Sequence, residues 1–262
     1  MSTSIIVVPC FNEVERLDVA AFRQFASANP EVRFLFVDDG STDRTLDVLG
    51  ELHRADPERL LLHALHRNVG KAEAVRNGLL AACSRGPRYV GFWDADLATP
   101  LEDIPVFAKL LDERPDTEMV FGSRVNLLGR NVHRNLGRHY VGRAFATVAA
   151  FTLGVGIYDT QCGAKLFRVS DGFIGRLQEP FIGSWIFDVE ILAREVQARK
   201  HGSLPPVRSI VYEHPLMEWR DVPGSKLRLG DWFAVGGSLV RIYWKYLRPS
   251  RAAAQERLTS GR

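Results

Sequence analysis

Residues 89–100, YVGFWDADLATP, contain the most informative local pattern in the chain. The first five residues are apolar or aromatic and are typical of a strand that is buried on both faces. We expect this strand to end at Asp94 and Asp96, where the chain can turn and aim both carboxylates at one point. A cation between the two carboxylates would relieve their repulsion. A site with oxygen ligands alone and few protein contacts suits Mg²⁺ or Mn²⁺, held jointly with substrate phosphates. The alternative is an ordinary turn that caps the next helix.

Short β-rich runs alternate with helical segments on both sides of this stretch. We expect strands at residues 4–8, 31–37, 60–65, 88–93, 119–124 and 205–212. We expect helices at residues 14–28, 42–53, 71–84, 144–153 and 185–200, and a last helix at 225–247. The alternation predicts right-handed βαβ units and a parallel sheet.

Polar motifs follow three of the expected strands directly, at residues 9–13, 38–41 and 94–96. In open α/β sheets, ligands bind outside the carboxyl ends of the strands, so these motifs are expected to share one ligand site. The sequence has no G-x-G-x-x-G after the first strand and no Walker A motif. A dinucleotide-binding fold and a P-loop are therefore not indicated.

The composition is that of an ordinary soluble globular protein, with 262 residues, 46% hydrophobic and 25% charged. A net charge of +3 gives no indication of a nucleic-acid partner. The cysteines Cys10, Cys83 and Cys162 are widely spaced, which favours a reducing cytosol and argues against structural zinc. We expect no signal peptide, because the N-terminus leads almost directly into a strand without a basic segment and an apolar h-region. We expect no membrane-spanning segment, because no apolar run reaches 18 residues.

The ordered set of motifs resembles the inverting nucleotide-sugar glycosyltransferases of family 2, which have the GT-A fold. The resemblance begins with VPCFNE at 8–13, VDDGSTD at 37–43, NVGK at 68–71 and DAD at 94–96. The later runs DTQCGAKLF at 159–167, FDVE at 187–190 and WRDVPGSK at 219–226 narrow it. Together they are similar to the dolichyl- or polyprenyl-phosphate sugar synthases, especially the dolichyl-phosphate β-glucosyltransferases, over about residues 4–248.

The resemblance implies a Rossmann-like GT-A domain, with a mostly parallel sheet flanked by helices, over residues 1–224. An amphipathic C-terminal helix over 225–248 and a flexible tail over 249–262 would follow. Because the helix contains tryptophans and basic residues, it could pack on the domain, lie in a membrane interface, or do both. The expected location is the cytoplasm, with peripheral contact to the cytoplasmic membrane face through this helix.

The same resemblance assigns roles in binding a UDP-sugar donor. It implies that Pro9 and Glu13 line the nucleoside pocket, and that Asp38 or Asp39 accepts a hydrogen bond from the base N–H. Lys71 would lie near the pyrophosphate or the base. Local structural roles remain as alternatives, since Asp38 could cap a turn and Lys71 could be a solvated residue in the first turn of a helix.

For the acidic motif, the resemblance implies that Asp96 binds Mg²⁺ or Mn²⁺ and that Asp94 contacts the ribose or sugar and shares the metal. One departure bears on this site. Related mannose synthases often have a Gln two residues after the second Asp, where this chain has Ala98. With Ala98 there, we expect a coordination shell that has fewer protein ligands or is completed by water.

A basic stretch at 126–140 includes Arg134 and Arg138, which could clamp the acceptor phosphate, since Arg binds phosphate oxygens bidentately. A solvated loop and helix start is the alternative. Asp159 lies where related enzymes with alcohol acceptors place a general base. A phosphate acceptor is already largely ionised at neutral pH. Asp159 could therefore act as a base or position the acceptor or sugar.

The function expected from this resemblance is transfer of a hexose, glucose from UDP-glucose, to a polyprenyl or dolichyl phosphate. An α-linked donor would give a β-linked product. The first alternative is a family 2 transferase with a soluble or polysaccharide acceptor. The second is a nucleotide-sugar-binding protein without turnover.

Overall fold

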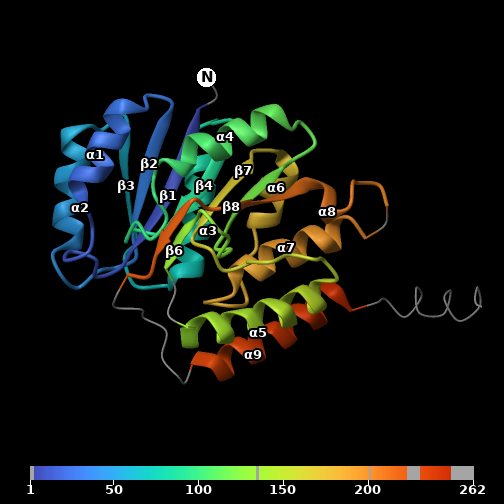
Figure 1. The fold of residues 1–262 in the computed structure, drawn as a ribbon. Coiled ribbons are helices and arrows are strands. Elements are labelled where there is room, and N and C mark those ends of the chain that lie inside the picture. The colour runs from blue at the N-terminus through green and yellow to red at the C-terminus, as the bar shows by residue number, and fades with distance from the viewer. Residues whose placement is uncertain (1–2, 134–135, 201, 223–230, 249–262) are drawn as a thin grey trace, which may run out of the picture.

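The computed structural model describes residues 3–133, 136–200, 202–222 and 231–248; for residues 133, 136–141 and 231–233 it describes the backbone alone. A seven-stranded sheet forms the centre of the molecule, with strand order β3-β2-β1-β4-β7-β5-β8 (Figure 1). Its strands are β1 (Ser4–Cys10), β2 (Val32–Asp38), β3 (Leu60–Ala64), β4 (Tyr89–Trp93), β5 (Met119–Ser123), β7 (Ala164–Arg168) and β8 (Val211–Pro215).

All strands of this sheet are parallel except β7, which runs antiparallel to its neighbours β4 and β5. The carboxyl ends of β1, β2, β4 and β5 therefore lie at one edge, and the first residues of β7 lie at that same edge. The mostly parallel sheet expected from the sequence is confirmed. The reversed β7 is a difference from the fully parallel alternation, and it brings the segment before residue 164 to the ligand-binding edge.

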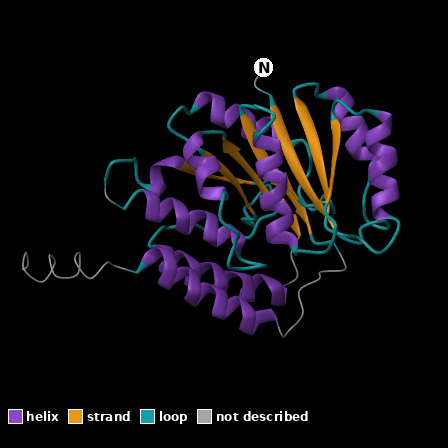
Figure 2. Ribbon diagram, turned by 180° about the vertical axis from the view of Figure 1, so that it is seen from behind, coloured by secondary structure: helices purple, strands orange, loops and turns teal. Residues whose placement is uncertain are grey.

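Helices cover both faces of the sheet (Figure 2). They are α1 (Val19–Ala28), α2 (Thr45–Ala55), α3 (Lys71–Cys83), α4 (Asp103–Glu113), α5 (Leu136–Leu153), α6 (Asp171–Leu177), α7 (Phe187–Ala198), α8 (Val207–Ile210) and α9 (Asp231–Ile242). A π-helical turn, Tyr243–Leu247, follows α9, and β6 (Asn131–His133) pairs with β9 (Glu218–Arg220) in a separate two-stranded sheet.

The two faces of the sheet have separate hydrophobic cores, and β1 shows how the sequence divides between them. Ile5 and Val7 face the core that contains residues of α3, α6 and α7, whereas Ile6 and Val8 face the core with α1, α2 and α4. Alternate residues of a strand point to opposite faces, so a run of apolar residues serves both cores. This explains why the first strand has no polar alternation.

The segment predicted as a strand at 205–212 differs in the structure. Residues Val207–Ile210 form the short helix α8, and the strand β8 begins only at Val211. Pro206 precedes this helical turn with an extended backbone (φ −66°, ψ 151°), a position where the missing N–H has no cost. Helix α1 also begins later than expected, because Asp18 caps it by accepting a hydrogen bond from the Ala21 N–H.

The helices α5 and α9 lie side by side at one end of the molecule (Figure 1, Figure 2). Residues 225–230 of the predicted last helix and the tail 249–262 lie outside the described residues. In the part that is described, the helix begins at Asp231 and continues into the π-helical turn. Among the described residues, no helix is both long enough and apolar enough to cross a bilayer.

Candidate active site

The loop after β1 places Glu13 at the ligand-binding edge. Its carboxylate is held by Arg16, whose Nε and Nη2 donate at 2.7 and 2.6 Å, and its backbone N–H donates to Thr45 Oγ1 at 2.8 Å. Pro9 is half-buried in β1, opposite Val37 of β2. Both residues predicted to line a nucleoside pocket therefore lie beside the end of β2, and that role stays a prediction.

Asp39, directly after β2, organises the neighbouring loop. Its two carboxylate oxygens accept from the backbone N–H groups of Val69 and Gly70 at 2.7 and 2.9 Å. Burial raises the pKa of Asp39, while these two hydrogen bonds act in the opposite direction. A Cβ at Gly40 would lie 2.5 Å from the backbone of Arg67, and Gly40 has φ +65°. The close approach of the Arg67 backbone explains why glycine follows the acidic pair. The hydrogen bonds from Asp39 fix the backbone just before α3.

Asp38, the other candidate for recognising the base, is in a different environment. Its Oδ2 accepts from the Ser41 N–H at 3.2 Å, as expected for a residue that caps a turn. Its Oδ1 is buried and has no hydrogen-bond partner among the described residues. Of the two aspartates, Asp38 thus has unused acceptor capacity, whereas both oxygens of Asp39 already hold the 69–70 backbone.

The Gly70–Lys71 step at the start of α3 brings a cation to the acidic motif after β4. Lys71 Nζ lies 2.5 Å from Asp94 Oδ1, and both side chains are half-buried. Burial would lower the pKa of Lys71, but the negative charge of Asp94 outweighs it, with contributions from Asp188 and Asp96, and the pKa is raised. Lys71 therefore stays charged at neutral pH.

Asp96 lies in the turn that follows. Its Oδ1 accepts from the Ala98 N–H at 3.1 Å, and the Leu97 N–H donates to the Asp94 carbonyl. Leu97 has φ +51°, an uncommon backbone conformation for a non-glycine residue that clusters at functional sites. Burial raises the pKa of Asp96, and repulsion from Asp94 raises it further.

The acidic pair fits a divalent cation shared with a ligand. Repulsion between two neighbouring carboxylates is what a bound cation would relieve, and magnesium sites often use one or two carboxylates plus substrate phosphates. Among the described residues, no group of three or more Asp, Glu, His or Cys side chains could hold a metal. The protein would thus supply Asp94 and Asp96, and phosphate oxygens and water would complete the coordination.

Asp159 lies in the segment before β7, at the same edge. Arg124, the first residue after β5, binds its carboxylate with both Nε (2.7 Å) and Nη2 (2.8 Å). Burial would raise the pKa of Asp159, but the Arg124 guanidinium overrides it and holds the pKa well below its usual range. A carboxylate this firmly paired is a poor proton acceptor.

Two further side chains fix the backbone around Asp159. Glu213 of β8 accepts from the backbone N–H groups of Tyr158 and Asp159, at distances of 2.8 to 3.0 Å. Arg143 of α5 donates to the Tyr158 carbonyl at 3.0 Å, and its guanidinium stacks 3.7 Å from the centre of the Tyr158 ring. Arg124 and Glu213 are not among the site residues predicted from the sequence. The position of Arg124 directly after a strand was the available signal.

The predicted acceptor arginines are described incompletely. Arg134 lies outside the described residues, and for Arg138, in the first turn of α5, only the backbone is described. Their role as a phosphate clamp stays a prediction. On the same helix, the side chain of Arg143 is described, and it donates to the backbone of the Asp159 segment.

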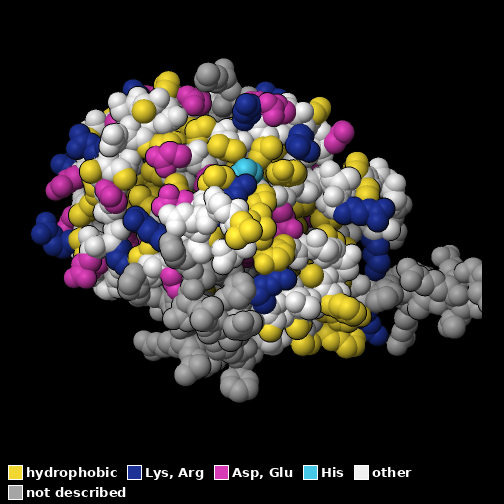
Figure 3. Space-filling model, in the orientation of Figure 1, with side chains coloured by type: hydrophobic (Ala, Val, Ile, Leu, Met, Phe, Trp, Pro, Cys, Tyr) yellow, Lys and Arg dark blue, Asp and Glu magenta, His cyan; other side chains and the backbone are white. Residues whose placement is uncertain are grey.

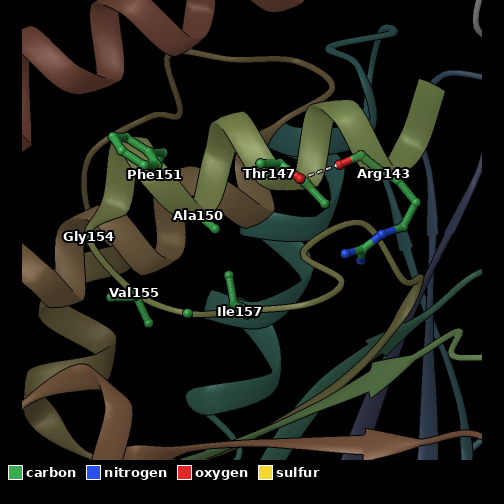
Figure 4. Close-up of a pocket in the computed structure, with 9 residues that line it drawn as sticks. Arg143, Thr147, Ala150, Phe151, Gly154, Val155 and Ile157 are labelled. Carbon is green, nitrogen blue, oxygen red and sulfur yellow. Dashed lines mark hydrogen bonds between the residues drawn. The ribbon is translucent and has the colours of Figure 1, made fainter. Parts of the chain in front are cut away.

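A pocket of about 530 Å³ opens between the C-terminal half of α5 and the loop that leads to Asp159 (Figure 4). Its lining is mostly apolar, with one charged side chain, Arg143, and consists of Arg143, Ala146, Thr147, Ala150, Phe151, Gly154, Val155, Gly156 and Ile157. Figure 4 shows Arg143 and Phe151 at opposite ends of it. The pocket therefore combines an apolar surface with the cation of Arg143. This cation binds the carbonyl of Tyr158, the residue before Asp159.

Comparison with known proteins agrees with the motifs. The model described as "Glycosyl transferase family 2" matches residues 5–171. Dolichyl-phosphate beta-glucosyltransferase ALG5D of Trichomonas vaginalis is 31% identical over 248 residues, covering 90% of this chain and 71% of that protein. The dolichyl-phosphate beta-glucosyltransferase of Saccharomyces cerevisiae is 30% identical over 267 residues, covering 92% of this chain and 74% of that protein. The resemblance stated from the sequence is confirmed.

Solved structures with the same fold include glucosyl-3-phosphoglycerate synthase from Mycobacterium tuberculosis. Its complex with UDP has a TM-score of 0.63 and 16% identity, covering 95% of this chain and 82% of that one. Its complex with Mn²⁺, UDP-glucose and phosphoglyceric acid has a TM-score of 0.60 and 15% identity, with the same coverage. The GT-A-like architecture with a C-terminal helix is confirmed.

Proposed function

Because the chain belongs to glycosyl transferase family 2, we propose that it transfers glucose from UDP-glucose to a polyprenyl phosphate, with inversion at the anomeric carbon. The observation that carries the proposal is the meeting of two paired charge groups at one sheet edge, Lys71 with Asp94 and Arg124 with Asp159. The negative charge of Asp94 also raises the pKa of Arg124, which supports a short distance between the two pairs. One pair suits the donor diphosphate and the other the acceptor side.

On the donor side, the uridine would lie against the loops after β1 and β2. Glu13 would accept from the ribose, and the free oxygen of Asp38 would accept from the base N–H. Asp39 would act indirectly, by holding the 69–70 backbone from which Lys71 projects. Lys71 would donate to a diphosphate oxygen, since an ammonium group stabilises the charge that develops as the sugar leaves.

A divalent cation held by Asp94 and Asp96 would neutralise charge on the departing diphosphate. The chain's own part is to hold the two carboxylates at that position. The Asp96 side chain is fixed by the Ala98 N–H and the turn at Leu97, and the Asp94 side chain by Lys71. Mg²⁺- and Mn²⁺-bound relatives of the same fold support the choice of metal.

On the acceptor side, the phosphate would attack the anomeric carbon from the face opposite the diphosphate. The attacking oxygen is already ionised at neutral pH, so no residue needs to remove a proton. The strong Arg124–Asp159 pair supports this assignment, because it leaves Asp159 to orient Arg124 rather than to act as a base. The first part of the prenyl chain would occupy the apolar pocket between Arg143 and Phe151.

A lipid acceptor requires access to a membrane, and exposed apolar side chains support such a contact. Phe151 of α5 is 90% exposed and Trp244 of the π-helical turn is 56% exposed. Figure 3 shows hydrophobic side chains gathered where these two elements adjoin. Arg241, Lys245 and Arg248 add positive charge nearby, which favours anionic lipid surfaces. We therefore place the membrane contact at the α5 and C-terminal helix end of the molecule.

The test is nucleotide release from a panel of UDP- and GDP-sugars, with Mn²⁺ or Mg²⁺, in the presence and absence of a short-chain polyprenyl phosphate. We expect UDP release from UDP-glucose that depends on the lipid phosphate and is abolished by Asp96→Ala. UDP release stimulated by phosphoglyceric acid or a sugar, but not by the lipid phosphate, would show that the acceptor is a soluble compound. UDP binding without any release would favour a non-catalytic protein.

A further inference from the structure

A lysine is buried in the centre of the sheet, behind the site just described. Lys165 of β7 has no exposed surface, and its Nζ lies 2.7 Å from a carboxylate oxygen of Asp188, in the first turn of α7. The ammonium group lies 5.0 Å from the ring centre of Phe92 and 4.9 Å from that of Phe121. Removing such a pair from water is costly, and a buried ion pair often adds nothing to stability over apolar residues.

The lysine also holds the turn that precedes its strand. Lys165 Nζ donates to the backbone carbonyl of Cys162. The next residue, Gly163, lies directly against Asp94: its carbonyl accepts from the Asp94 N–H at 3.0 Å. A Cβ at Gly163 would lie 1.9 Å from Asp94 Oδ2, so the carboxylate occupies the space that any side chain would need. The orientation of Asp94 therefore depends on where the 162–163 turn is fixed.

We propose that Lys165 and Asp188 are positioning residues, which fix the 162–163 turn and so hold the Asp94 carboxylate toward Lys71 and the metal. This proposal rests on the proposed function, because it concerns the donor site. The chain of contacts runs from Asp188 to Lys165, to the Cys162 carbonyl, and through Gly163 to Asp94. Asp188, Lys165 and Cys162 are all buried.

A purely structural role for the pair makes a different prediction. If Lys165 and Asp188 only contributed to folding, an apolar pair of similar size would preserve both stability and activity. If they position Asp94, the apolar pair Lys165→Met with Asp188→Leu would keep the fold but release the turn. Misplacement of a reacting group by about 1 Å can lower the rate about 100-fold. The double substitution also avoids leaving one buried charge without its partner.

The experiment is a cycle in which Lys165→Met/Asp188→Leu and Asp94→Asn are made separately and together in the full chain. Two quantities are measured: kcat with UDP-glucose, and the Kd of UDP with Mn²⁺ by calorimetry, which requires no turnover. The melting temperature of each variant is measured in parallel. Glu195→Gln is the control. Glu195 is also buried and paired with Arg176 and Arg199, but it takes no part in the series of contacts from Asp188 to Asp94.

We expect the apolar pair to lower kcat about 10- to 100-fold and to weaken UDP binding, with a melting temperature close to that of the unsubstituted protein. In the Asp94→Asn background the same pair should change kcat and Kd less than about threefold, since coupled sites are not additive. Glu195→Gln should lower the melting temperature and leave kcat and Kd unchanged.

Equal losses in both backgrounds, or no loss from the apolar pair, would overturn the positioning role. These results are distinct from a failure of the proposed function. If the unsubstituted protein binds UDP but uses another sugar or acceptor, the cycle is measured with that substrate or through the Kd of UDP. Only the donor or acceptor assignment then changes. If it binds no UDP, the proposed function fails, and the positioning proposal fails with it.

Discussion

At the scale of single residues, the site consists of side chains whose charges are set by partners distant in the sequence. Lys71 and Asp94 are 23 residues apart, and Arg124 and Asp159 are 35 apart. The consequence is that each charged residue has a defined ionisation state. Lys71 stays protonated beside Asp94, and Asp159 stays ionised beside Arg124. These states suit the proposed binding of a diphosphate and the proposed positioning role of Asp159.

The first prediction concerns Lys71. Replacing Lys71 with Met removes the cation beside Asp94 and should lower kcat/KM for UDP-glucose about 100-fold, the usual loss when one group that stabilises developing charge is deleted. Steady-state kinetics would measure it. Lys109→Met is the matched control, because Lys109 is a largely exposed lysine on α4. A loss below about threefold for Lys71→Met would contradict the role at the diphosphate.

A pH dependence of stability is expected from Asp103, a buried residue in the first turn of α4. Burial, with a smaller effect of Glu102, raises its pKa from 3.8 to about 6. The folded protein therefore binds this proton more tightly than the unfolded chain. The stability that it contributes is fully present below the unfolded pKa and is lost as the pH rises through about 6. The shift corresponds to about 3 kcal/mol.

Asp103→Asn removes this titration. Relative to the variant, the unsubstituted protein should lose up to about 3 kcal/mol of unfolding free energy between about pH 4 and pH 7. Denaturant unfolding at several pH values would measure the difference. The exposed Asp116→Asn serves as a control. A difference between wild type and Asp103→Asn that is constant with pH would show that Asp103 has an ordinary pKa.

At the scale of elements, much of the fold was predictable because its signals are local. The strand at 89–93 is a short apolar run followed directly by acidic residues, and strands buried on both faces have this pattern. The same pattern predicts that Asp38, Asp39, Asp94 and Asp96 lie at the carboxyl-end edge of the sheet. The helix α8 and the reversed strand β7 were not predicted, since a short apolar run does not specify the direction of its neighbour.

The parts of the site that were not predicted depend on tertiary contacts. Nothing near Asp94 in the sequence indicates that a lysine pairs with it. Lys71 reaches it because Asp39 fixes the 69–70 backbone in front of α3. Arg124 reaches Asp159 because β7 runs antiparallel and returns the preceding segment to the edge where β5 ends. Such pairings require the strand order, which the sequence did not provide.

Attachment of the C-terminal helix to the domain gives a prediction at this scale. The buried Tyr246 hydroxyl donates to Glu190 Oε1 of α7 at 3.0 Å, and Arg194 donates to the same oxygen at 2.7 Å. Tyr246→Phe removes a hydrogen bond to a buried carboxylate and should lower the unfolding free energy by about 2 kcal/mol. Tyr243→Phe is the control, since Tyr243 is partly exposed. Equal stability of both variants would contradict this attachment.

At the scale of the whole molecule, the pocket proposed for the acceptor and the proposed membrane contact lie at the same end. The pocket is lined by α5, and the exposed Phe151 belongs to that lining. The π-helical turn that contains Trp244 contacts both α5 and α7. A prenyl chain could therefore remain partly in the bilayer while its phosphate reaches Arg143 and the Asp159 segment. This arrangement requires no helix to cross the membrane.

The contact can be tested by flotation with vesicles containing phosphatidylglycerol. The intact chain should float with the vesicles, and Phe151→Ser with Trp244→Ser should reduce the bound fraction several-fold, because two large apolar groups no longer enter the interface. Leu46→Ser, an exposed apolar residue of α2, should float like the unsubstituted protein. If the intact chain stays at the bottom of the gradient, or if the double variant floats equally well, this surface does not bind the membrane.

The most direct measurement is isolation of the product formed from UDP-glucose and a short-chain polyprenyl phosphate. Mass spectrometry should find one hexose on the lipid phosphate, and the anomeric coupling in the proton NMR spectrum should identify a β linkage. The Asp96→Ala variant should form none. A glucosylated lipid phosphate with an α linkage would contradict inversion. UDP release that yields free glucose or another glucoside, with no lipid product, would contradict the acceptor.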